Sequence, residues 1–133
     1  PGRPDGNEQL ARLETTTSGQ KDYGARIRGY IHPPVTGEYR FWIAADDRAL
    51  LLLSTGVSPE NARQIAGVPD PTLMREWGKF STQASAPVRL QAGQRYYIEV
   101  IHKQADYKDN VAVAWQSPGR ERAVVDGAYL SLP

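Results

Sequence analysis

Residues 36–53 read TGEYRFWIAADDRALLLL and contain the patterns that decide the fold. From 39 to 43 the apolar side chains alternate with other residues, the period of a β-strand that buries one face. The run of leucines at 50–53 is typical of a central strand covered on both faces. Asp46 and Asp47 separate the two patterns. We therefore expect two strands with an acidic turn between them at the rim of a sheet.

Similar alternation recurs along the chain in short windows separated by Gly and Pro, and no helical pattern persists for the length of a helix. Further strands are predicted at 25–31, 64–68, 95–103, 110–116 and 128–132. Seven or eight short strands favour an all-β fold, an antiparallel sandwich or a closed barrel.

Two local features complete this prediction. The strand at 25–31 stops at Pro33-Pro34, and the turn at Thr36-Gly37 leads into the next strand, so these two strands are expected to form a hairpin. Ser58-Pro59 has the hydroxyl and the proline that begin a helix, so one short helical turn is expected from Pro59 to about Arg63.

The length of 133 residues fits a single domain with its own core. Residues 1–22 are expected to be an irregular lead-in with a partial first strand, and 23–133 the sandwich. The net charge of +1 lacks the basic footprint of a nucleic-acid-binding protein. The longest apolar run, Ala49–Leu53, is too short to cross a bilayer. A secretion signal or a neighbouring domain is expected to lie outside this sequence.

The sequence lacks the motifs of an enzyme. No Cys is present, and neither His32 nor His102 lies in a nucleophile elbow, a zinc-binding helix or a phosphate loop. Asp46 and Asp47 are adjacent, so on a strand their side chains would point to opposite faces and would not flank a glycosidic bond. We therefore expect no catalysis. His102 is interpreted as a partly buried structural residue.

The tryptophans are interpreted as structural. Trp42 and Trp115 lie on predicted strands and are expected in the core, because Trp buries much apolar area. Trp77 is also expected to be structural.

A second polar segment, 103–110, lies between two predicted strands. It is rich in oxygen ligands: Gln104, Asp106, Tyr107, Asp109 and Asn110. Calcium binds six to eight oxygens from carboxylates, amides, backbone carbonyls and water, so this segment and the aspartate pair together have the composition of a calcium site. The aspartate pair taken alone favours an ordinary acidic turn, and a solvated hairpin loop explains 103–110 as well as a calcium site does.

The sequence from Tyr23 to Pro118 resembles the PA14 domain. The resemblance is carried, in the family's order, by Gly29-Tyr30-Ile31, Thr36-Gly37-Glu38-Tyr39-Arg40-Phe41-Trp42-Ile43, Asp46-Asp47, Leu52-Leu53-Ser54, Tyr96-Tyr97-Ile98-Glu99 and Ala112-Val113-Ala114-Trp115-Gln116. It implies a jelly-roll-type antiparallel β-sandwich, and in lectin members a calcium ion that binds sugar hydroxyls.

The resemblance also implies a ligand set. Asp46 and Asp47 match an aspartate pair joined by a cis peptide, and Gln104 matches a side-chain amide, with Asn110 as the alternative. The implied calcium ligands are Asp46, Asp47, Gln104, the backbone carbonyls of Asp106 and Lys108, and Asp109 as a further ligand. The implied sugar-binding residues are Asp46, Asp47, Gln104 and Tyr107. Many bacterial members have glycines where this chain has 105–108, so the carbonyl assignments depend on a different loop path. Tyr107 fits a ring that stacks on a sugar and a ring packed on the rim equally well.

These features imply a calcium-dependent carbohydrate-binding module of a larger extracellular or cell-surface protein. Its ligand is a glycan or a monosaccharide, and its role is adhesion or targeting. As an isolated module it is expected to be monomeric, without nucleic-acid binding or membrane insertion. The alternative is a structural or protein-interacting accessory domain of a secreted enzyme or toxin, in which calcium is structural or absent.

Overall fold

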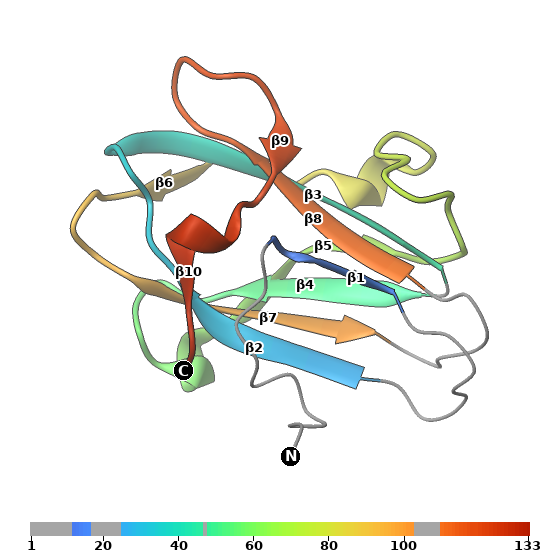
Figure 1. Ribbon diagram of the computed structural model, residues 1–133, viewed down its shortest axis with the longest axis horizontal. Coiled ribbons are helices and arrows are strands. Elements are labelled where there is room, and N and C mark those ends of the chain that lie inside the picture. The colour runs from blue at the N-terminus through green and yellow to red at the C-terminus, as the bar shows by residue number, and fades with distance from the viewer. Residues whose placement is uncertain (1–11, 17–24, 47, 103–109) are drawn as a thin grey trace.

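The computed structural model describes residues 12–16, 25–46, 48–102 and 110–133. Its strands are β1 (Glu14–Thr16), β2 (Ala25–Ile31), β3 (Gly37–Asp46), β4 (Ala49–Leu53), β5 (Arg63–Val68), β6 (Val88–Leu90), β7 (Tyr96–His102), β8 (Asn110–Gln116), β9 (Ala123–Val124) and β10 (Leu130–Ser131). They form two antiparallel sheets, one in the order β1-β8-β3-β6 with β9 also beside β8, the other in the order β10-β2-β7-β4-β5. Figure 1 shows the sheets face to face. The predicted antiparallel sandwich is confirmed.

The core lies between the sheets and is built by the alternation seen in the sequence. On β3 and β8 the inward positions are fully or almost fully buried: Tyr39, Phe41, Ile43, Val111, Val113 and Trp115. The facing sheet contributes Ile31, Leu51, Leu53, Ile98 and Val100. Trp115 lies within ring-contact distance of three rings, with centroids 5.1 Å from Tyr39, 6.0 Å from Phe41 and 5.5 Å from Tyr129. The interpretation of Trp115 as a core residue is confirmed.

The hairpin predicted from 25–31 and 39–43 is not formed. β2 pairs with β7 and β10 in one sheet, whereas β3 pairs with β8 and β6 in the other. The segment between them contains Pro33-Pro34, which lack backbone donors, and it carries the chain from one sheet to the other. The Tyr39 hydroxyl donates to the carbonyl of Val35 at 2.5 Å and so holds this crossing.

The helical content is limited to single 3₁₀ turns in the part of the chain that the structure describes. The turn at Pro59–Asn61 is the predicted one, and Ser81–Gln83 and Gly127–Tyr129 add two more. Ser58 does not cap the first turn with its side chain, since its hydroxyl bonds the Glu60 carboxylate at 3.0 Å instead. None of the described helices is long and apolar enough to span a membrane.

The predicted central strand β4 lies between β5 and β7, with buried Ala49, Leu51 and Leu53 on its inner face. Leu50 and Leu52 are only half-buried, so the second face is covered incompletely. The short strands β6 and β9 were not predicted, because two or three residues are too few to show an alternating pattern.

Beyond β6, one edge of β3 is completed by side chains and single backbone hydrogen bonds of the segment between β5 and β6 instead of by a strand. β6 pairs only with residues 37–39, and beyond it the edge is bonded by three buried polar residues: Ser85, Gln83 and Thr72. The amide of Phe41 donates to the Ser85 hydroxyl at 3.0 Å, Gln83 Nε2 donates to the carbonyl of Ile43 at 2.9 Å, and the amide of Ala45 donates to Thr72 Oγ1 at 3.0 Å. The segment between β5 and β6 is thereby fixed against the sheet.

Candidate functional site

The predicted rim is the end of the sandwich at which β3 and β7 stop and β8 starts, at the right of Figure 1. Asp46, the last residue of β3, lies directly opposite Asn110, the first residue of β8. Residues opposite each other in an antiparallel pair have Cα atoms about 4.5–5.5 Å apart and side chains on the same face. The aspartate and the asparagine are therefore neighbours on the outer face of the first sheet.

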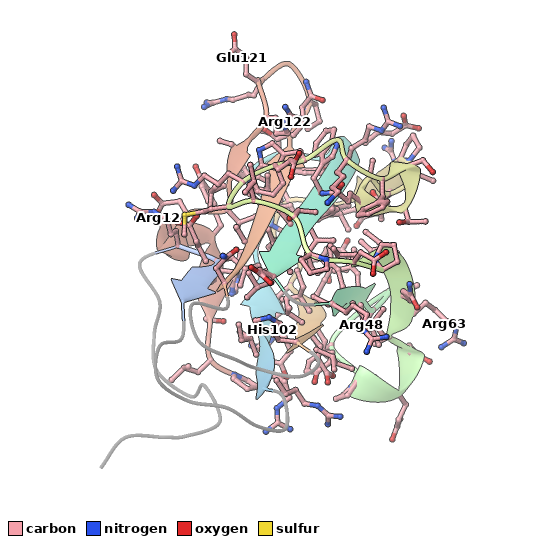
Figure 2. The ribbon with its side chains drawn as sticks, turned by 90° about the vertical axis from the view of Figure 1, so that its right-hand side faces the viewer. Arg12, Arg48, Arg63, His102, Glu121 and Arg122 are labelled. Atoms are coloured by element: carbon pink, nitrogen blue, oxygen red, sulfur yellow. The ribbon has the colours of Figure 1, made fainter. Side chains whose placement is uncertain are left out.

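His102 joins the second sheet to this rim. It ends β7, is 3% exposed, and its Nε2 lies 3.0 Å from the backbone oxygen of Asp46. Figure 2 looks onto this end of the sandwich, with His102 near the centre and Arg48 to one side. The structural role predicted for His102 is confirmed, and its contact fixes the position of the last residue of β3.

The side chain of Asn110 is the unusual feature of the rim. Its Oδ1 is buried and has no hydrogen-bond partner among the residues that the structure describes. A buried acceptor without a partner is costly, by about 1–3 kcal/mol, and such atoms in native proteins call for an explanation such as a bound ion. Amide and carboxylate oxygens are ligands that calcium prefers, so Asn110 Oδ1 and the neighbouring Asp46 carboxylate fit a calcium ion.

Most of the predicted ligands lie outside the described residues, and so does the peptide bond between Asp46 and Asp47. Those ligands are Asp47, Gln104, Asp106, Lys108 and Asp109, together with the predicted sugar-stacking residue Tyr107. They stay predictions. The structure does bring Asp46 together with Asn110, the alternative amide ligand. No group of three or more His, Cys, Asp or Glu side chains suited to a metal occurs among the described residues.

A strap formed by Thr72, Leu73, Met74 and Arg75 borders this part of the sheet. Thr72 is bonded to Ala45 at the free edge of β3, and Arg75 forms two hydrogen bonds to the carboxylate of Glu14 on β1, at 2.7 and 2.8 Å. Since β8 lies between β1 and β3, the strap crosses β8 on the outer face. It passes over a row of buried alanines, Ala44 and Ala112, whose small side chains leave room for it.

The strap lies next to the pair of Asp46 and Asn110, because that pair is one row further along the same face than Ala44 and Ala112. Leu73 is 74% exposed and Met74 48%, so the rim has an apolar border. Arg75 has a left-handed backbone with φ 59°, uncommon for a residue other than glycine. The hydrogen bond from Arg75 is the main cause that lowers the pKa of Glu14.

Two further tryptophans lie on the outer face. Trp42 is half-buried and points away from the core, so the expectation that it belongs to the core is wrong. Its ring is covered by the guanidinium of Arg122, 4.9 Å from the ring centroid, and the same group lies 6.0 Å from the Trp77 ring. Trp77 thus helps to hold the segment between β5 and β6, in agreement with a structural role.

A buried acidic group missed by sequence reasoning lies on β7 in the second sheet. The Tyr97 hydroxyl donates to Glu99 Oε1 at 2.7 Å, and Arg26 Nε is 2.9 Å from Glu99 Oε2. Burial, with the neighbouring carboxylate, raises the pKa of Tyr97 to about 12. The single carboxylate is held by a phenol and a guanidinium, an arrangement that stabilises the sheet.

The sequence profile described as the PA14 domain matches residues 6–127. The chain belongs to the PA14 domain family. The resemblance found in the sequence is confirmed, and the two-sheet fold is the fold of the solved PA14-type structures that it matches.

The relatives are larger proteins. Mouse N-acetyl-beta-glucosaminyl-glycoprotein 4-beta-N-acetylgalactosaminyltransferase 1 is 42% identical over 119 residues, which are 84% of this chain and 12% of that protein. Mouse fibrocystin-L is 35% identical over 82 residues, 62% of this chain and 2% of that protein. The chain therefore spans about an eighth or less of these two relatives.

The solved structures share the fold at low sequence identity. The Epithelial Adhesin 9 A domain of Candida glabrata, in complex with Galβ1-4GlcNAc, superposes with a TM-score of 0.61 at 18% identity over 91% of this chain and 68% of that chain. An anti-sigma factor domain-containing protein of Clostridium clariflavum superposes with a TM-score of 0.63 at 19% identity over 95% of this chain and 44% of that chain.

Proposed function

We propose that this PA14 domain is a non-catalytic, calcium-dependent carbohydrate-binding module. The observation that carries the proposal is the buried Oδ1 of Asn110 beside Asp46 at the rim, for which the described part of the chain offers no hydrogen-bond partner. Calcium would be held by Asp46, Asp47 and an amide oxygen, with the carbonyls of Asp106 and Lys108 and the side chain of Asp109 as further ligands. The amide at Asn110 has the support of the geometry, and Gln104 remains the alternative.

A bound calcium ion would supply open coordination positions for two neighbouring sugar hydroxyls. The residues of this chain would contribute the remaining contacts. Asp46 and Asp47 accept hydrogen bonds from the same hydroxyls, and Tyr107 offers a ring for the apolar face of the pyranose. The exposed Leu73 and Met74 of the strap border the same part of the face.

Support for a saccharide ligand comes from the solved relatives of the same fold. Three Candida glabrata adhesin domains were solved with Galβ1-4GlcNAc, β-lactose or Galβ1-3GlcNAc. We infer that this chain binds a glycan as part of a larger extracellular or cell-surface protein and serves its adhesion or targeting. A single shallow site of this kind is expected to bind with a Kd on the order of 1 mM and to gain strength through multivalency.

A second candidate function is that of an accessory domain without a sugar ligand. It is favoured by the mouse transferase, in which the similar stretch is only 12% of the protein. Calcium would then stabilise the rim and nothing more. The two functions differ in whether a saccharide changes the environment of the rim when calcium is present.

The experiment is an NMR titration of the folded chain with Galβ1-4GlcNAc, read at the backbone amides of Ala45, Asn110 and Ala112. Saturable shifts are expected with calcium, and none at these amides with EDTA. Asp46→Asn and Asn110→Ala should each weaken the calcium-dependent binding at least tenfold. Glu38→Gln and Asn61→Ala make the same kinds of change at exposed positions away from the rim and should have no effect.

Two results would argue against the lectin function. Shifts at the rim amides that persist in EDTA would rule out the calcium mechanism. If calcium raises Tm by mass action but no saccharide in a glycan array binds, the accessory function is the correct one.

A further inference from the structure

A cavity of about 550 Å³ opens at the other end of the first sheet, away from the rim. It lies where β8 ends, under β9 and the 3₁₀ turn at Gly127–Tyr129. β8 has seven residues, so its two ends are about 20 Å apart. The cavity is therefore separate from the candidate calcium site, and its volume lies within the range of ligand pockets in proteins, about 300–1,000 Å³.

The apolar part of the lining is aromatic. Trp115 is 5% exposed and is the most buried of the lining residues, and the half-buried ring of Tyr129 is tilted against it with a centroid distance of 5.5 Å. Pro34, from the crossing between the sheets, and Val124 of β9 extend this surface toward the mouth. A wall of this kind suits the CH groups on one face of a pyranose ring.

The polar part of the lining combines hydrogen-bond donors and acceptors that are available to a ligand. The side chains of Ser117, Arg120 and Glu121 make no hydrogen bond or ion pair with the described residues. Asp126 accepts from the Ala128 amide at 2.8 Å with Oδ1 only, which fixes its carboxylate and leaves Oδ2 available. Figure 2 shows Glu121 at the outer tip of its loop.

The mixture of groups indicates the class of ligand. One guanidinium and two carboxylates give the lining a net negative charge, which disfavours phosphates and other anions. The guanidinium in turn disfavours a simple cation. Sugar hydroxyls both donate and accept, so a neutral saccharide uses the arginine, the carboxylates and the serine together.

We propose that this cavity is a second saccharide-binding site, which takes a neutral pyranose or a terminal disaccharide without a metal. The sugar places its apolar face on Tyr129 and Pro34 and its hydroxyls toward Arg120, Glu121 and Asp126. Two sites about 20 Å apart on one domain would let a branched or clustered glycan be held at two points.

The test is an NMR titration of the folded chain in EDTA with Galβ1-4GlcNAc, with glycerol at equal hydroxyl concentration as a control. Saturable shifts with a Kd on the order of millimolar are expected at the amides of Gly119, Ala123 and Ala128 and at the Trp115 indole. Arg120→Ala combined with Glu121→Ala, both at exposed positions, should weaken this binding at least fivefold. Glu38→Ala combined with Arg89→Ala removes the same residue types elsewhere on the surface and should leave it unchanged.

The outcomes separate this proposal from the calcium site, because the two are read at opposite ends of β8. An absence of shifts at the cavity up to 50 times the expected Kd, or the same shifts with glycerol, would overturn the second site. Binding of N-acetylarginine amide there without any saccharide binding would show a site for cationic side chains instead. Failure of the calcium-dependent shifts at Asn110 would leave the cavity proposal intact.

Discussion

Replacement of Gln83 by Leu tests whether side chains complete the edge of β3. Gln83 is fully buried, although glutamine is usually exposed, and its amide bonds three backbone groups. Nε2 donates to the carbonyls of Ile43 at 2.9 Å and Glu76 at 2.6 Å, and Oε1 accepts from the amide of Phe80 at 2.7 Å. Gln83→Leu keeps the approximate size of the side chain and removes all three bonds.

The expected loss follows from the burial of each group that is left behind. The carbonyl of Ile43 is buried with its bond, so leaving it without a donor costs about 2 kcal/mol. The partners at Glu76 and Phe80 are part-buried and can recover some hydration, which lowers their cost to about 1 kcal/mol each. The apolar leucine returns about 1 kcal/mol. The net loss is about 3 kcal/mol, a decrease in Tm of about 10–15 °C for a chain of this length.

Urea unfolding followed by the fluorescence of the buried Trp115 measures this loss. The midpoint is expected to fall by about 1.5 M with an unchanged m-value. Gln94→Leu is the matched control, because Gln94 is exposed and uses only its backbone in hydrogen bonds, and it should change stability by less than about 0.5 kcal/mol. If Gln83→Leu behaves like this control, the edge of β3 does not depend on the glutamine and the reasoning is refuted.

Three other predictions concern charge and pH. Arg75→Ala should lower Tm slightly at pH 7. The difference in Tm from wild type should shrink as the pH falls below the ordinary Glu14 pKa of 4.5, because a lowered pKa stabilises the fold only while the carboxylate is ionised. A difference in Tm that does not change with pH would contradict this. Tyr97→Phe should reduce the loss of stability that wild type shows between pH 10 and 12, because the pKa of Tyr97 is raised from 10.0 to about 12 and folding opposes its ionisation. Part of the loss should remain, because burial also raises the pKa of Tyr39. Urea midpoints of both proteins across that range are the measurement, and parallel curves would contradict the prediction. Arg122→Ala should cost about 1 kcal/mol and change tryptophan emission by uncovering Trp42 and Trp77, whereas an unchanged spectrum would exclude the stacking.

Residue periodicity predicted the long strands because burial repeats within each of them. Residues 110–116 and 25–31 were predicted with the bounds that the structure has, since a period of two persists over seven residues. The pairing of β2 with β3 was predicted wrongly. Strands that are close in sequence usually pair as a hairpin. Here the segment with Pro33-Pro34 takes the chain from one sheet to the other, and the local sequence does not show that it does so.

The candidate site was predicted only in part, because the sequence shows where a strand ends but not which residue of another strand lies opposite that end. Asp46 was placed at a rim from its position at the end of an alternating strand, and the structure confirms this place at the end of β3. Asn110 was only the alternative amide, because counting along a loop does not show which side chain will face the aspartate. The register of β3 and β8 places Asn110 opposite Asp46, and that register depends on contacts between residues 64 positions apart.

The polar residues that complete the edge of β3 connect the stability of the fold to the proposed sugar site. Thr72 forms hydrogen bonds to Ala45 with both its backbone amide and its hydroxyl, and Asp46 is the next residue after Ala45. Thr72 therefore fixes both the strap and the start of the acidic turn. His102 holds the carbonyl of Asp46 from the other sheet. A carboxylate that must meet an amide oxygen around one ion has to be positioned to within a few tenths of an ångström, and rigid strands with supporting hydrogen bonds provide that precision. We therefore expect that loss of these supporting contacts weakens ligand binding through the geometry of Asp46, although none of the groups concerned touches the ligand.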